Sequence, residues 1–148
     1  MIEVKELVQQ EKLLNFEDVF SKDLDAAGNC ITGHNNHMAN YLREAFSKAK
    51  KIDIVVAFLM ESGIRFLEED FKNIKKSNIP IRILTGNYLN ITQPQALNKL
   101  KDIFGDKVDL KFYKEPKRSF HPKAYIVEYE QGGDIFVGFS NVSRQVGM

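Results

Sequence analysis

The feature that most constrains the fold is an apolar segment at residues 52–59, with the sequence IDIVVAFL. It is rich in β-branched residues, and its length and apolarity are typical of a strand covered on both faces. We therefore expect a central strand of a sheet. The rest of the chain has to supply the neighbouring strands and the covering helices.

The flanking segments alternate between helical and strand-like patterns. Apolar residues recur every three or four positions, as in amphipathic helices, at residues 38–49, 62–78 and 94–103. Strand-like runs follow at residues 81–85, 108–113, 124–129 and 134–139. The last two runs are separated by residues 130–133, which end in two glycines and predict a hairpin. The sequence thus predicts an α/β sheet with helices on both faces.

Length and composition favour a single domain over residues 1–148, with 43% hydrophobic residues to form one core. The formal net charge of +1 points to no partner, so a nucleic-acid site would need a local basic patch. One cysteine, no signal peptide and no apolar run near ~18 residues predict a cytoplasmic protein without a membrane partner. The final residues lack a polar taper, which suggests an N-terminal fragment of a longer protein.

The candidate site is a histidine and a lysine two residues apart, His121 and Lys123. Side chains alternate along a strand, so both are expected to point to the same side. An ammonium can hold phosphate oxygens while a neutral imidazole attacks phosphorus or shuttles a proton. The hairpin is expected to bring Ser140 and Asn141 to the same end, where they can donate hydrogen bonds to phosphoryl oxygens. Together these residues predict a phosphodiester site.

These residues resemble the phospholipase D superfamily, whose repeat reads H-x-K, four residues, D, then G-S-x-N. His121 and Lys123 match the first element, and Gly138 and Asn141 match the last; Glu128 stands at the aspartate, and the serine position holds a phenylalanine. The resemblance covers residues 40–148 and implies a phospholipase D-like mixed sheet. Within that superfamily, the chain is similar to the domain that precedes some bacterial DEAD/DEAH-type helicases and to single-motif restriction nucleases. No G-x-x-x-x-G-K-[ST] loop is present, so helicase chemistry would belong to a C-terminal part.

The resemblance implies a metal-independent nuclease acting on DNA, without a cofactor, through a phosphohistidine on His121. Lys123 and Asn141 would be catalytic, and Ser140 would help to bind the phosphate. Because one chain carries one motif, the competent form is expected to be a homodimer. The alternative is a catalytically silent nucleic-acid-binding domain. A phospholipase is disfavoured because no apolar interfacial helix with a basic face stands out.

A local basic patch accompanies the motif, formed by Lys114, Lys117 and Arg118. Aromatic residues at 113, 120 and 125 interleave with these charges, and such a combination suits nucleic acid as well as core packing.

A second cluster is Cys30, His34 and His37, at C-x-x-x-H-x-x-H spacing. Thiolate and imidazole are ligands that zinc prefers, but a fourth ligand is not in view. An ordinary loop before a helix is the favoured interpretation, and we expect no metal site.

Overall fold

The computed structural model describes residues 38–114 and 117–138, all within the second of two units into which the chain divides, His37–Met148. The strands are β1 (Lys51–Val56), β2 (Ile81–Gly86), β3 (Val108–Tyr113), β4 (Lys123–Glu128) and β5 (Gly133–Val137). The helices are α4 (Met38–Lys48), α5 (Glu61–Phe66), α6 (Glu68–Lys76) and α7 (Pro94–Phe104), with 3-10 turns η1 (Tyr88–Asn90) and η2 (Gly105–Lys107). The single domain expected over residues 1–148 stays a prediction.

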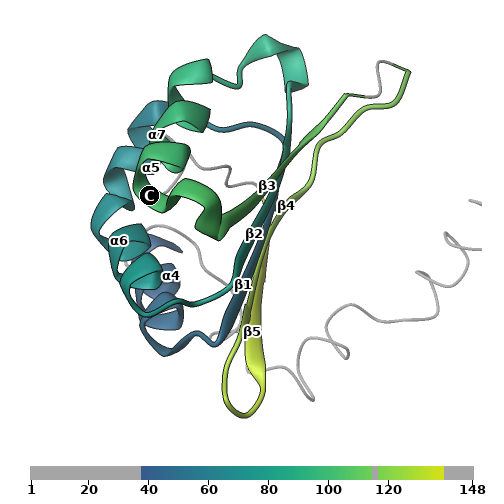
Figure 1. The fold of residues 1–148 in the computed structure, drawn as a ribbon. Coiled ribbons are helices and arrows are strands. Elements are labelled where there is room, and N and C mark those ends of the chain that lie inside the picture. The colour runs from purple at the N-terminus through teal and green to yellow at the C-terminus, as the bar shows by residue number, and fades with distance from the viewer. Residues whose placement is uncertain (1–37, 115–116, 139–148) are drawn as a thin grey trace, which may run out of the picture. The chain divides into compact units, whose positions relative to one another are not determined.

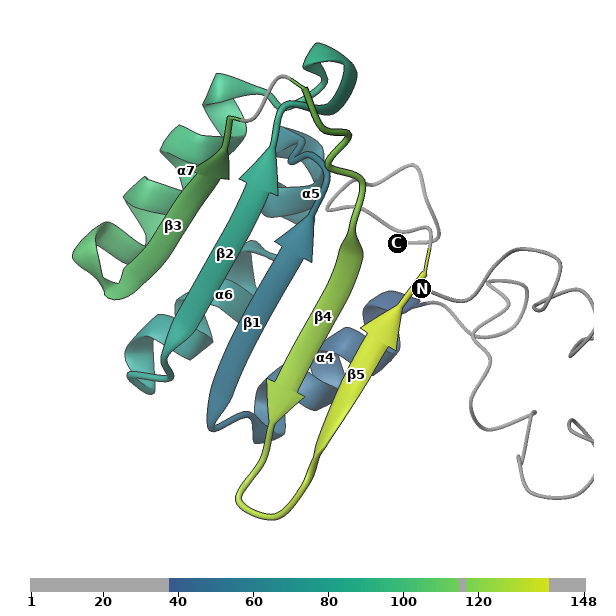
Figure 2. The same ribbon diagram turned by 90° about the vertical axis from the view of Figure 1, so that its right-hand side faces the viewer.

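The five strands form one mixed sheet in the order β3-β2-β1-β4-β5 (Figure 2). The strands β1, β2 and β3 are parallel, as crossover helices require. The strand β4 runs antiparallel to β1, and β5 returns antiparallel to β4 through the predicted hairpin. The predicted central strand therefore lies in the middle of the sheet.

The described helices all cover the same face of the sheet, where the core lies (Figures 1 and 2). On that face the alternate residues Ile52, Ile54 and Val56 of β1 are buried. Phe71 of α6 packs between helices, with ring centroids 6.2 Å from Phe46 and 5.5 Å from Phe104. Since these rings are fully or almost fully buried, one core joins α4, α6 and α7 to the sheet.

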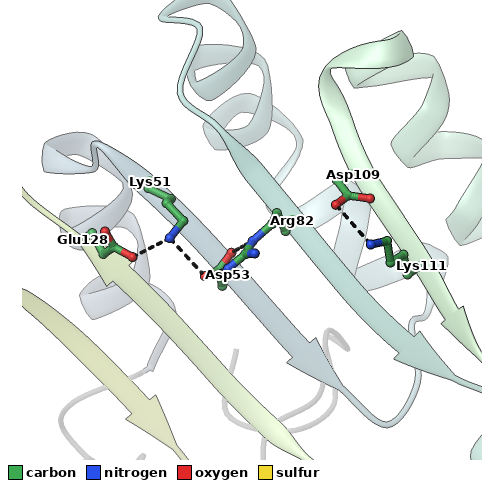
Figure 3. Close-up of polar contacts among 6 residues, drawn as sticks. All are labelled: Lys51, Asp53, Arg82, Asp109, Lys111 and Glu128. Carbon is green, nitrogen blue, oxygen red and sulfur yellow. Dashed lines mark hydrogen bonds and ion pairs between the residues drawn. The ribbon is translucent and has the colours of Figure 1, made fainter.

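The opposite face of the sheet carries charged side chains instead of described helices (Figure 3). Arg82 makes two hydrogen bonds to Asp53, at 2.5 and 2.6 Å, and Lys51 lies 2.7 Å from Glu128. The prediction of helices on both faces thus differs from the described structure, in which helices cover one. The apolar run at residues 52–59 suggested a strand covered on both faces. In the structure Asp53 alternates with the buried residues Ile52 and Ile54, so one face of β1 is buried and the other carries charge.

Two predicted boundaries also differ. The strand predicted over residues 52–59 ends at Val56; further on, the Leu59 amide donates to Thr92 Oγ1 and the Leu59 carbonyl accepts from the Gln93 amide. The helix predicted over residues 62–78 is divided at Leu67, although its buried stripe continues across the break. Among the described residues, no helix has the length and apolarity to span a bilayer.

Candidate active site

The topology brings one connection across the carboxyl ends of the parallel strands. From the end of β3 the chain must pass β2 and β1 to reach β4, which starts at the same edge (Figure 2). Consequently Lys123, the first residue of β4, pairs with Val56, the last residue of β1. Ligands of open α/β sheets usually bind at this edge, so it is where a site is expected.

Lys123 points to the helix-covered side, together with Tyr125 and Val127 further along β4. It is only 8% exposed, and a buried ammonium is costly unless it has a polar partner. Burial raises the pKa of the neighbouring Tyr125 phenol, which therefore adds no negative charge. Lys123 therefore supplies a positive charge to this edge of the sheet.

His121 provides the partner. Its ring nitrogens Nδ1 and Nε2 lie 2.8 and 2.9 Å from Lys123 Nζ, and its carbonyl oxygen lies 3.4 Å away. Such similar distances put Nζ over the ring, because an in-plane approach to both nitrogens would collide with the carbon between them. An ammonium can only donate, so it meets either a lone pair or the π face of the ring. The structure thus brings His121 and Lys123 together, with the histidine exposed to solvent.

A second contact to His121 involves a residue that the sequence interpretation missed. The ring of Tyr88, in η1 directly after β2, lies 4.3 Å from the His121 ring, centroid to centroid. The signal available in the sequence was position: Tyr88 follows the carboxyl end of a parallel strand, and such positions converge at one edge. Tyr88 holds one side of the imidazole while Lys123 holds another.

The hairpin returns the chain to the same edge. The Gly138 amide donates to the Lys123 carbonyl at 3.2 Å, so the residues after β5 start beside Lys123. Ser140 and Asn141 lie outside the described residues. Glu128 is at the far end of β4 and pairs with Lys51 on the charged face, so it has no contact with the His121 edge.

The predicted basic patch lies on the connection that crosses the edge. Lys114, Lys117 and Arg118 are exposed and line a groove of about 600 Å³ whose other wall is η1. Phe120 and Tyr113 stack within it at 4.6 Å between ring centroids and 18° between ring planes. The patch and the histidine therefore lie on the same connection.

No metal centre is formed by the described residues, in which no three His, Cys, Asp or Glu side chains are grouped to hold an ion. Cys30, His34 and His37 lie outside that part of the chain. The zinc alternative for these three residues stays untested.

Comparisons with known proteins bear on the fold. No protein-family model and no curated protein matches the sequence. Phosphatidylserine synthase from Haemophilus influenzae Rd KW20 matches over 65% of this chain and 26% of its own, with a TM-score of 0.51 and 14% sequence identity. NucT from Helicobacter pylori matches over 72% of this chain and 67% of its own, with a TM-score of 0.47 and 18% identity. The chain spans only a minor part of the synthase, and that likeness confirms the predicted phospholipase D-like α/β fold.

Proposed function

We propose that this chain belongs to the phospholipase D superfamily and is a metal-independent phosphodiesterase that cleaves DNA. The observation that carries the proposal is the contact of Lys123 Nζ with the exposed His121 ring, 2.8 Å from Nδ1. An ammonium beside an uncharged imidazole is suited to hold a phosphodiester anion against its nucleophile. The location at the carboxyl edge of parallel strands adds support.

In the proposed reaction, a His121 nitrogen bonds to phosphorus as the bond from phosphorus to the leaving oxygen breaks. That oxygen takes a proton from His121 of the partner subunit. Water then attacks phosphorus and gives its proton to the same partner histidine, and the phosphorus–nitrogen bond breaks. Lys123, Asn141 and Ser140 stabilise the phosphoryl oxygens throughout.

The mechanism needs two histidines, and one chain carries one motif, so we infer that the competent form is a homodimer. In the proteins that the sequence resembles, a helicase part follows such a domain. A helicase part in this protein would act on the same DNA that this domain binds or cleaves.

A catalytically silent DNA-binding domain is the second candidate. The observation that favours it is Phe139 at the motif's serine position, which removes a hydroxyl from the expected phosphate-binding group. Such a domain would bind DNA through Lys123 and the basic patch without forming a covalent intermediate.

The deciding experiment is hydrolysis of single-stranded DNA and bis(p-nitrophenyl) phosphate by the full chain in EDTA. We expect His121→Ala to lower turnover by about 10³-fold and Lys123→Ala by about 10- to 100-fold, the loss of a charge-assisted hydrogen bond to phosphate. Lys101→Ala, an exposed lysine of α7 outside the site, is the matched control and should leave turnover unchanged. Equal activity of His121→Ala and the parent would refute the proposal that His121 is the nucleophile of a phosphodiesterase.

An acid-labile, base-stable phosphoryl adduct on the parent, absent from His121→Ala, would identify the intermediate. DNA binding that depends on Lys123 without adduct or turnover would favour the silent domain. The dimer has its own measurement: specific activity should fall as the chain is diluted through its dimer dissociation constant.

A further inference from the structure

The groove beside His121 has a chemical character of its own. Its two walls are segments that each follow a parallel strand: η1 after β2, and the connection after β3. Aromatic rings occur on both walls, Tyr88 on the first and the stacked pair Tyr113 and Phe120 on the second. Among the described residues that line the groove, three are basic and none is acidic.

The groove is continuous with the proposed nucleophile. Tyr88 lines it and also contacts the His121 ring, and Phe120 precedes His121 in the chain. A phosphate bound beside His121 and Lys123 would therefore have its adjoining nucleoside at the mouth of the groove. The basic side chains Lys117 and Arg118 line the same groove and would add positive charge for the following phosphates of a bound strand.

The η1 wall has a backbone conformation that is energetically unfavourable. Leu89 and Asn90 both have left-handed backbones, with φ of 50° and 56°, which cost non-glycine residues energy. The turn is held by the side-chain amide of Asn87, whose Nδ2 donates to Asn90 Oδ1 at 2.8 Å. As a result the Leu89 side chain is 73% exposed at the groove, an apolar surface next to the aromatic one.

These features differ from what phosphate binding alone requires, because phosphate needs only donors and positive charge. Aromatic and apolar walls with a basic lining suit a base that stacks on a ring while its backbone is neutralised. Bases of a duplex are already stacked on each other and present only their edges, so they cannot enter such a groove.

Resting on the proposed phosphodiester site, we propose that this groove is a nucleobase subsite. It accepts an unpaired base of a single-stranded nucleic acid next to the phosphate on His121, and Phe120 is its stacking residue. The domain thereby selects single strands over duplexes.

The test measures the binding of fluorescent octamers to the full chain by anisotropy, with thymidine, abasic and duplex oligonucleotides. The parent and every variant in this test carry His121→Ala, so that the octamers are not cleaved during the measurement. The abasic octamer has the same phosphates and no bases. Phe120→Ala is the informative variant, since Tyr88 also contacts His121 and would confound the result. We expect Phe120→Ala to raise Kd for the thymidine octamer about 10-fold, with Phe120→Trp restoring it. Tyr41→Ala, an exposed tyrosine of α4 outside the groove, is the matched aromatic control.

The abasic octamer isolates stacking from folding defects. The parent should bind it more weakly than the thymidine octamer, and Phe120→Ala should bind both with similar Kd. An equal loss on both octamers, or binding of the duplex as tight as that of the single strand, would overturn the subsite. Binding and turnover are measured on different chains, so the two proposals can fail separately. If the subsite discriminates between the octamers but the chain with His121 shows no turnover, only the phosphodiesterase is refuted. Turnover without discrimination between octamers would refute only the subsite.

Discussion

Gly86→Ala tests the packing that builds the groove. A Cβ at this last residue of β2 would lie 2.8 Å from Phe120 Cδ1, whereas ordinary contact begins at 3.4 Å. The φ of Gly86 is not in the left-handed region, so alanine fits its backbone, and the nearest conflict is with the Phe120 ring. That ring stacks on Tyr113 with 4.6 Å between ring centroids, so a shift that relieves the conflict disturbs the stacking.

The expected magnitude follows from these contacts. Losing an aromatic pair costs about 0.5–1.5 kcal/mol, and crowding of a packed site costs about 1–3 kcal/mol when it cannot relax. Removing a flexible glycine from the unfolded chain offsets up to about 1 kcal/mol. Because Phe120 is half-buried and has room to move, we expect a net loss near 1 kcal/mol in the free energy of unfolding.

The assay is urea unfolding of the full chain in a double-mutant cycle with Phe120→Ala. In that background the added methyl meets no ring, so Gly86→Ala should be neutral or stabilising by up to about 1 kcal/mol. The coupling free energy between the two positions should then be about 1–2 kcal/mol. An equal cost of Gly86→Ala in both backgrounds would show that Phe120 does not pack on β2, and would remove the wall of the proposed subsite.

Two further predictions concern the sheet. The Arg82 guanidinium holds the pKa of Asp53 below its ordinary value of 3.8, so their pairing stabilises the folded chain above that pH and is lost as the pH falls through the lowered pKa. Asp53→Asn should therefore lower the free energy of unfolding by about 1 kcal/mol at pH 7 and by less near pH 3; an unchanged difference would contradict the pairing. Thr85 is fully buried and, among the described residues, its hydroxyl has no hydrogen-bond partner. Thr85→Val should stabilise the chain by about 1 kcal/mol in urea unfolding, whereas a loss would indicate a hydroxyl bonded in solution.

Local pattern determined much of this protein. The β-branched run, the helical spacing and the two glycines at the turn between β4 and β5 were sufficient to predict the strands and the hairpin, because both depend on neighbouring residues. The alternation of side chains along a strand likewise related His121 to Lys123, since two residues is one period of a strand.

Only the tertiary structure decided which segments meet. Strand order sends the chain after β3 across β2 and β1, and this brings Phe120 onto Gly86 and Tyr88 onto His121, residues 34 and 33 positions apart in the sequence. The same is true of the charged face, where Arg82 pairs with Asp53 only because β1 and β2 are parallel neighbours in one register. Contacts between distant residues depend on strand order and register, and no local pattern carries that information.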